Sequence, residues 1–502
     1  MRLSELVSQV PHRLVGPEAD PEVRSVTHDS RCAVEGTLFA AFPGANADGR
    51  TFLREAIGRG AIAALGPAPA PESLSVPYIE VNDPRAAAGF VAARLAGDPS
   101  KRLVMIGVTG TSGKTTTTLL IDRMLEKRHA KRGLFGTLVY RGSGDAVEAV
   151  RTTPEATELQ PMLAALVADG GTAAVMECSS HALALGRLSG CAFDIVAFLN
   201  LSRDHLDFHR DLEDYFQTKA RLMGMLKPHG KAIVNVDDPY GRRLFEMLPL
   251  GRAISFALGE ETTADVKGGA RTESDRTVLR VWDFASKHNL EIVSPLLGLP
   301  NAANLLAAAA IGGALGLSPG EIAEGLSAVT AIPGRMERVP NSFGFTLLVD
   351  YAHKPGALEG VLKTARALAH STKGRVLVVF GCGGDRDRGK RPEMGRIAVD
   401  LADDVIVTSD NPRSEEPEAI LRDIQAGIAE TGRPATFLVD RRQAIAEAIR
   451  RARRGDVLVI AGKGHEKTQE TAGVKEPFDD RVVARELLAA RELLAAREGA
   501  HG

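Results

Sequence analysis

Cysteine, charge of one sign and long apolar runs are all scarce in this sequence, and each scarcity excludes a class of protein. Its four cysteines, Cys32, Cys178, Cys191 and Cys382, form no C-x-x-C pair and no zinc-finger spacing. We therefore expect reduced thiols in a cytoplasmic protein, not a disulfide framework. The 62 basic and 64 acidic residues leave a formal net charge of −2. Such a balance gives no reason to expect nucleic acid or an anionic membrane as a partner.

The apolar stretches are too short to cross a membrane. The longest runs from Leu305 to Leu317 and is interrupted by Gly312 and Gly313, whereas a spanning helix needs about 20 apolar residues. The N-terminus, MRLSELVSQVPHRL, lacks the apolar centre of a signal peptide and predicts a short amphipathic helix. We expect a soluble monomer without membrane insertion.

What the sequence does have is length and a regular alternation of apolar strands with helices. Its 502 residues suffice for about three domains of ~150 residues. Breaks at Gly97–Ser100 and at Pro333-Gly334 predict domains at 1–97, 98–333 and 334–502. Strands are expected at Leu103–Val108, Ala173–Met176, Ile195–Leu199, Ala232–Val236, Val376–Phe380, Val405–Thr408 and Val457–Ile460. This rhythm predicts an α/β protein with mostly parallel, doubly wound sheets. At the C-terminus, a repeated RELLAA hexamer (485–496) predicts a lengthened terminal helix.

A glycine-rich turn between a predicted strand and a predicted helix indicates a phosphate site. The turn and helix start comprise Gly110, Thr111, Ser112, Gly113, Lys114, Thr115 and Thr116, although Val108 replaces the first glycine of the full Walker pattern. In this arrangement backbone N–H groups and the helix N-terminus bind phosphates. Lys114 is expected to reach the terminal phosphates and the Thr115 hydroxyl to ligate Mg²⁺.

Polar side chains follow two further strands of the same predicted sheet. Glu177 begins E-C-S-S-H after one strand, and His205 lies in N-L-S-R-D-H-L-D after another. Ligands of doubly wound sheets bind beyond the carboxyl ends of the strands, so these groups should meet the phosphate turn. A carboxylate and an imidazole there suit Mg²⁺ and phosphoryl oxygens.

Taken in order, the motifs resemble those of the Mur ligases. They are Gly110–Thr116, Glu177–His181, Asp204–His209, Lys219, Asn301 with Asn304, Gly334–Glu337 and Asp350–His353. The resemblance implies a small N-terminal UDP-binding domain, a central ATPase-like domain and a C-terminal Rossmann-like domain. It implies that ATP phosphorylates the carboxylate of a UDP-muramoyl dipeptide, and that an amine attacks the acyl phosphate during peptidoglycan synthesis. Folylpolyglutamate synthetases share part of this set.

The resemblance also assigns roles around ATP. Lys219 matches the lysine that becomes carbamylated to N6-carboxylysine; a carbamate can hold a second Mg²⁺ with Glu177 and His205, whereas an ammonium group would repel it. Asn301 matches the adenine position, and Arg335 and Asp350 match hinge motifs that contact ATP phosphates when the domains close. Lys114, Glu177, His205 and Lys219 are the implied catalytic residues.

Two more sets are carried by the resemblance. The UDP-muramoyl-dipeptide contacts are Ser30, Ala45, Asn46, Ala47, Thr152, Thr153, Ser179 and Arg187, while Leu185 replaces a glutamine often found in the family. A D-N-P-R motif resembles the branch that adds meso-2,6-diaminopimelate. Arg386, Asp410, Asn411, Pro412, Arg413, Gly462 and Glu466 are the implied diaminopimelate contacts.

Other functions stay open at this point. The lysine-adding branch typically lacks Arg413, and folate enzymes need no uridine site. A nucleotide-binding regulator without catalysis should have lost Lys114, Glu177, His205 or Lys219, and all four are present.

Overall fold

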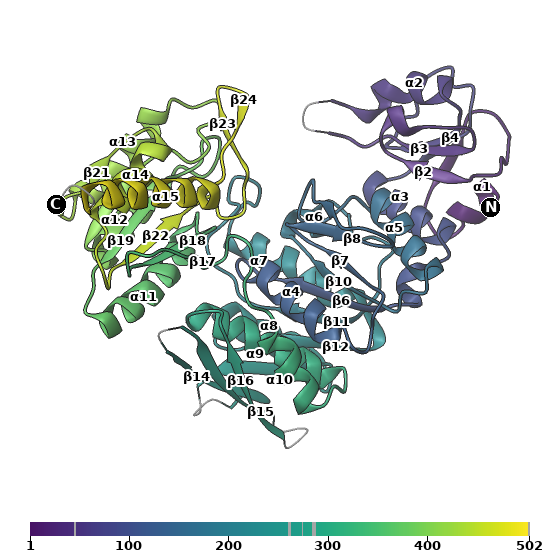
Figure 1. Cartoon of the computed structure of the whole chain (residues 1–502). Helices are drawn as coiled ribbons and strands as arrows, with labels where there is room; N and C mark the ends of the chain where they lie inside the picture. The colour runs from purple at the N-terminus through teal and green to yellow at the C-terminus, as the bar shows by residue number, and fades with distance from the viewer. Residues whose placement is uncertain (45–46, 260–262, 274, 284–287, 500–502) are drawn as a thin grey trace.

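Three large sheets, each accompanied by helices, follow one another along the chain in the computed structural model, which describes residues 1–44, 47–259, 263–273, 275–283 and 288–499 (Figure 1). In Figure 1 the N-terminal and C-terminal units lie on opposite sides of the central unit. The predicted α/β class is confirmed. No helix among the described residues is long and apolar enough to cross a membrane.

The N-terminal sheet has the order β1-β5-β4-β3-β2 and is parallel except at β1. Its elements are α1 (Leu3–Val7), β1 (Arg13–Val15), β2 (Ser25–Thr27), β3 (Thr37–Ala40), α2 (Leu53–Gly58), β4 (Ala61–Gly66), β5 (Tyr78–Glu80) and α3 (Pro84–Leu95). Helix α3 starts where Asp83 accepts a hydrogen bond from the backbone N–H of Ala86 and Pro84 occupies the first turn. It packs against α5 (Ala156–Ala168) of the central unit.

The central sheet has the order β16-β15-β14-β13-β12-β11-β6-β10-β7-β8-β9. Its strands are β6 (Val104–Thr109), β7 (Arg132–Phe135), β8 (Val139–Arg141), β9 (Val147–Glu148), β10 (Ala173–Glu177), β11 (Phe193–Phe198), β12 (Leu226–Asn235), β13 (Ala253–Leu258), β14 (Val266–Thr272), β15 (Thr277–Asp283) and β16 (His288–Ser294). Strands β14 to β7 of this order are mutually parallel, as predicted. Antiparallel hairpins at both edges extend the sheet beyond the prediction.

Helices cover both faces of the central sheet. They are α4 (Lys114–Leu125), α5, α6 (Ser180–Ala184), α7 (Leu212–Ala220), α8 (Pro239–Met247), α9 (Leu299–Ala314) and α10 (Pro319–Ser327). One core joins Ile121 and Leu305 to strand residues such as Ile106, and a second joins Leu163 and Phe216 to the opposite face. These two cores fix β6, β10 and β11 side by side, so their carboxyl ends form one rigid edge.

The C-terminal sheet has the order β17-β18-β22-β19-β20-β21 and is parallel except at β17. The elements of this unit are β17 (Glu337–Val339), β18 (Thr346–Asp350), α11 (Pro355–Thr372), β19 (Val376–Phe380), α12 (Lys390–Leu401), β20 (Asp404–Val407), α13 (Pro417–Ala429), β21 (Thr436–Phe437), α14 (Arg441–Arg451), β22 (Val457–Ala461), β23 (Thr468–Thr471), β24 (Val474–Pro477) and α15 (Asp480–Gly499). Strands β23 and β24 pair with each other in a separate antiparallel hairpin. Helix α15 contains both RELLAA hexamers, as predicted. The domain boundaries at 97/98 and 333/334 stay a prediction; the three separate sheets support them.

Candidate active site

The phosphate turn connects β6 to α4 and is held by the turn after β11. Asn200 accepts hydrogen bonds from the backbone N–H of Thr111 through its carbonyl (3.0 Å) and from that of Ser112 through its side chain (2.9 Å). Gly113 has φ +87°, and a Cβ there would lie 2.3 Å from Asn304 Oδ1. Only glycine fits this close approach, so the turn presents a fixed set of N–H groups at the start of α4.

Lys114 folds back over this turn. Its ammonium group donates to the carbonyls of Gly110 (2.8 Å) and Thr111 (3.2 Å). Burial, with the nearby Lys354 charge, lowers the pKa of Lys114 to about 8. An anion bound at the turn would raise the pKa of Lys114 again, because a nearby negative charge favours the charged form of lysine.

Glu177 ends β10 and lies almost fully buried beside the start of α4. The Thr115 hydroxyl donates to its carboxylate (3.0 and 3.1 Å), and the backbone N–H of Thr137, after β7, donates at 2.7 Å. A threonine hydroxyl next to a carboxylate is a hard oxygen pair of the kind that Mg²⁺ prefers. The sequence therefore identified Thr115 and Glu177 as neighbours, but it gave no indication of Thr137.

Lys219 reaches the same turn from α7. Its side chain is buried, its ammonium group donates to the Gly110 carbonyl at 2.9 Å, and it lies 4.5 Å from the centre of the Tyr215 ring. Burial and the charges of Lys114 and Lys354 hold the pKa of Lys219 well below its ordinary value. An uncharged amine is the form that adds carbon dioxide, so this environment suits a carbamate.

His205 lies between β11 and α7, with its backbone at φ +52°. Its Nε2 lies 2.9 Å from Asp204 Oδ2, and its ring meets the edge of His181 at 4.7 Å. Burial favours the neutral form of Asp204, but Lys354 and His205 outweigh it and hold its pKa well below the usual range. Over the described residues, no three His, Cys, Asp or Glu side chains are arranged to hold a metal. Of the four predicted metal ligands, only Glu177 and His205 belong to these residue types.

A cavity of about 300 Å³ opens above the phosphate turn, between the central and C-terminal units. Every predicted ATP contact except Gly110 lines it: Thr111, Ser112, Gly113, Lys114, Thr115, Thr116, Asn301, Arg335 and Asp350. Asn301 donates to the Leu297 carbonyl (2.8 Å), which orients its side chain on α9. The structure therefore brings together residues more than 200 positions apart in the sequence.

Arg335 and Asp350 line this cavity from the C-terminal unit, and Arg335 reaches across it to the central unit. Arg335 donates to Thr115 Oγ1 (3.4 Å) and lies over the Tyr351 ring at 4.5 Å. Asp350 accepts the backbone N–H of Met336 (2.7 Å), and burial raises its pKa to about 6. These contacts connect the C-terminal unit directly to the residue that follows Lys114.

Asp350→Asn should stabilise the protein more at pH 7.5 than at pH 4.5. The folded pKa of Asp350 is raised, so the native chain loses stability as pH rises from about 4 to about 6, and asparagine removes this loss. The shift corresponds to about 3 kcal/mol at most. Melting temperatures of both proteins at the two pH values measure it, with Asp400→Asn, at an exposed carboxylate on α12, as control. An equal effect at both pH values would contradict the prediction.

A second cavity, of about 210 Å³, follows the carboxyl ends of β19, β20 and β22. It is lined by Arg386, Asp410, Asn411, Arg413, Gly462 and Glu466 of the predicted diaminopimelate set, whereas Pro412 does not line it. Asn411 donates to Glu466 (2.7 Å), and the Arg413 guanidinium donates to the Gly384 carbonyl (2.7 Å). Two guanidinium groups and two carboxylates of the predicted set thus face one space, which Arg203, Asp204, Asp207 and Asp387 also line.

Some residues in or beside this second cavity were not predicted as contacts: Arg203 and Asp387 line it, and Lys463 supports two predicted residues from behind. Lys463, although it lies within the predicted G-K-G-H-E turn, donates to both Asn411 and Glu466 at 3.1 Å and fixes them. Burial raises the pKa of Asp410, and a Cβ at Gly462 would lie 2.4 Å from Asp410 Oδ2, so Gly462 is required there. Arg203 of the central unit reaches Asp387 at 3.2 Å. The sequence predicted that the turns after these strands would line one pocket, but it did not predict which side chains would contact each other there.

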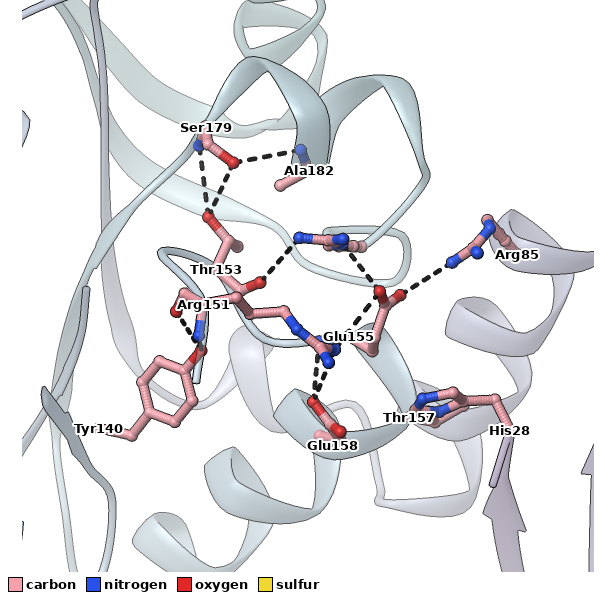
Figure 2. A network of polar contacts seen from close by, with 11 residues as sticks. His28, Arg85, Tyr140, Arg151, Thr153, Glu155, Thr157, Glu158, Ser179 and Ala182 are labelled. Atoms are coloured by element: carbon pink, nitrogen blue, oxygen red, sulfur yellow. Dashed lines mark hydrogen bonds and ion pairs between the residues drawn. The ribbon is translucent and has the colours of Figure 1, made fainter. Parts of the chain in front are cut away.

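Three of the predicted dipeptide contacts, Thr153, Ser179 and Arg187, meet in a network around Glu155, at the start of α5 (Figure 2). The Thr153 hydroxyl donates to the Glu177 carbonyl (2.7 Å) and lies 3.3 Å from the Ser179 hydroxyl. The Glu155 carboxylate lies 2.9 Å from Arg187 and 3.1 Å from Arg85 of α3. The network therefore connects the central unit to the N-terminal unit.

The first-domain contacts are only partly described. The Ser30 hydroxyl donates to Glu55 (2.8 Å), and nearby His28 lies 2.8 Å from the Thr157 hydroxyl of the central unit (Figure 2). The Ala47 carbonyl accepts the backbone N–H of Gly44 (3.1 Å). Ala45 and Asn46 lie outside the described residues. Thr152, by contrast, lines the cavity above the phosphate turn.

Comparisons with known proteins agree with this arrangement. The profile of the Mur ligase middle domain matches residues 108–312, and that of the Mur ligase, glutamate ligase domain matches residues 334–464. A UDP-N-acetylmuramoyl-L-alanyl-D-glutamate–2,6-diaminopimelate ligase of Streptomyces avermitilis is 45% identical, over 97% of this chain and 96% of its own. The enzyme of that name from Solibacter usitatus is 42% identical, over 97% and 98%.

Solved structures give the same result. One of the same name aligns with a TM-score of 0.68 at 33% identity, covering 98% of this chain and 99% of its own. A MurF ligase of Thermotoga maritima in complex with ADP aligns with a TM-score of 0.64 at 20% identity, over 93% and 99%, and shows a shared fold. Because its ordered motifs converge on one cleft and its relatives match it along nearly its full length, this chain belongs to the Mur ligase family.

Proposed function

We propose that this enzyme adds meso-2,6-diaminopimelate to UDP-N-acetylmuramoyl-L-alanyl-D-glutamate at the expense of ATP, a step of peptidoglycan precursor synthesis. The second cavity is the observation that carries the choice of amine. Arg386 and Arg413 supply guanidinium groups for carboxylates, and Glu466 supplies a carboxylate for an ammonium group. An amino acid with a head group at each end matches this set, and the relatives' names agree with it.

The two cavities divide the reaction between them. ATP occupies the cavity above the phosphate turn, where Lys114 offsets phosphate charge and Asn301 meets the adenine. The dipeptide enters from the Thr152, Thr153, Ser179 and Arg187 side, and its UDP group extends toward Ser30. Its carboxylate oxygen attacks the γ-phosphorus and ADP leaves; the amine then attacks the acyl carbon and phosphate leaves. The substrate carboxylate and the ATP phosphates are both negatively charged, so positive charge at the phosphate turn is needed to bring them together.

Magnesium and a carbamate fit the residues around the turn. Thr115 and Glu177 would hold one ion, and Glu177 and His205 with a carbamylated Lys219 would hold a second. When bound, the ions neutralise charge on the phosphoryl oxygens. With domains at 1–97, 98–333 and 334–502, ATP would bind between the second and third domains, and the UDP group would bind near the first.

A phosphate-release assay with the UDP-muramoyl dipeptide tests the proposal. Release should depend on meso-diaminopimelate and be weak with L-lysine, and a folate with glutamate should give none. Preferential use of lysine would assign the chain to the lysine-adding branch. No release with any amine in the presence of ATP and Mg²⁺ would contradict a ligase.

Lys114→Ala should lower kcat more than a hundredfold. It removes an ammonium group from the phosphate turn, and one preorganised charge contact contributes about 3 kcal/mol to the transition state. Steady-state kinetics measure the effect. Lys127→Ala, which removes an exposed lysine beyond the same helix, is the control; turnover of Lys114→Ala close to that of the control would remove this turn from the mechanism.

A further inference from the structure

Lys354 occupies the boundary between the two cavities. It is the residue directly before α11, where the C-terminal unit meets the phosphate turn. Of the described residues, His205, Tyr351, His353 and Lys354 line both cavities. If ATP fills one cavity and the amine fills the other, the reacting groups meet beside these four side chains. Lys354 is the one lysine or arginine among them.

The contacts of Lys354 direct its charge to the phosphate turn. Its ammonium group donates to the Thr111 carbonyl at 3.3 Å and forms an ion pair with Asp204 at 2.5 Å. The side chain is largely buried, with 11% of its surface exposed. Asp204 lies on the central unit, so the pair aligns a cation of the amine-binding unit with the turn that binds ATP.

Three lysines converge on two neighbouring carbonyls. Lys114 and Lys219 donate to Gly110, and Lys114 and Lys354 donate to Thr111. The Lys114 and Lys354 ammonium groups repel one another in this buried site, and carbonyl oxygens, which only accept hydrogen bonds, do not neutralise them. A polyanion at the turn would remove the repulsion. This clustering distinguishes Lys354 from an ordinary interdomain ion pair.

We propose that Lys354 is a further catalytic residue, whose ammonium group contacts the phosphoryl group during its transfer from ATP to the substrate carboxylate. Asp204 is its positioning residue. The inference rests on the proposed function, because it requires an acyl phosphate formed in one cavity and consumed by an amine from the other.

The chemistry needs no change in the protonation of Lys354. In the first step the carboxylate oxygen bonds to the γ-phosphorus while the bond to the β-phosphate oxygen of ADP breaks. In the second, the amine nitrogen bonds to the acyl carbon, the C–O bond to phosphate breaks, and the nitrogen loses one proton to solvent. Lys354 donates N–H to phosphoryl oxygens in both steps, where negative charge is concentrated.

Lys354→Met tests the proposal, since methionine keeps the length of the side chain and removes its charge. Asp204 keeps His205 as a partner in this variant. We expect kcat to fall about 10²-fold, while KM for ATP changes by less than about threefold. ADP lacks the transferred group, so the rise in melting temperature caused by ADP should persist. Lys354→Arg, which keeps N–H donors, should recover part of kcat.

Lys227→Met is a matched control. Lys227 also pairs with an aspartate, Asp194 (2.7 Å), and with a backbone carbonyl, that of Leu103 (2.7 Å), but it lines neither cavity. Its loss should leave kcat near normal. A similar kcat for Lys354→Met and Lys227→Met would overturn the inference, as would loss of the ADP effect in Lys354→Met, which would indicate a structural role. If Lys354→Met does not fold, Lys354→Gln, which also removes the charge, is judged by the same criteria. Failure of the unmodified enzyme to ligate diaminopimelate would instead contradict the proposed function.

Discussion

L-lysine should be a poorer substrate than meso-diaminopimelate by about 10⁴-fold in kcat/KM. The two amines differ by one carboxylate at the far end. With lysine bound, a guanidinium of Arg386 or Arg413 would face the second cavity without its anionic partner. Sites built around a polar substrate group reject an analogue that lacks it by roughly this factor, and an unpaired buried charge can cost about 3–5 kcal/mol. Kinetics with each amine under identical conditions measure the ratio.

Arg413→Ala should raise KM for diaminopimelate steeply and reduce this preference. The Arg413 side chain is anchored by the Gly384 carbonyl, so it faces the cavity in a defined position. KM for ATP and for the UDP-dipeptide should change little, because their sites lie around other residues. Arg388→Ala is the control: Arg388 lies in the neighbouring segment after β19, pairs with Glu415 at 3.0 Å, is 71% exposed and does not line the cavity. Comparable kcat/KM for the two amines in the unmodified enzyme would contradict the assignment.

The sequence predicted which turns converge because the rule behind this prediction is geometric. Once β6, β10 and β11 are adjacent and parallel, Gly110, Glu177 and Asn200 must follow at one edge. The same rule gave the second cavity from the turns after β19, β20 and β22. Strand positions agreed within a few residues for most elements, since buried parallel strands read as continuous apolar runs.

Contacts between the units could not be predicted from the sequence. The positions of Lys354 beside Asp204 and of Arg335 beside Thr115 depend on how the C-terminal unit meets the central one. Nothing in either local pattern specifies that orientation. The same holds for Arg85, whose approach to Glu155 depends on the packing of α3 against α5. The edge hairpins were missed for another reason: β15 and β16 pair with each other locally and carry no motif.

Lys219→Ala should lower kcat by about 10³-fold. Our hypothesis is that Lys219 acts as its carbamate, and its environment favours this: it is buried, it lies close to Lys114, and its pKa is held well below the ordinary value. Loss of the anion would remove a ligand that would hold the second Mg²⁺, and with it the charge that the ion would offer to the phosphoryl oxygens, an effect of several kcal/mol, or about 4 here. Short carboxylic acids added to Lys219→Ala should restore part of the activity, because they supply the missing anion.

Two measurements separate this hypothesis from a role for the ammonium group. The unmodified enzyme, incubated with ¹³C-bicarbonate, should show a carbamate carbon signal by NMR that Lys219→Ala lacks. Lys219→Arg should be as inactive as Lys219→Ala, because arginine keeps the positive charge but cannot form the carbamate under these conditions. Lys227→Met, which removes a lysine distant from the turn, should keep both the signal and the activity. Full activity in Lys219→Gln or Lys219→Met would show that no anion is required at this position. Any magnesium at the phosphate turn would then be held by Thr115, Glu177 and His205 alone.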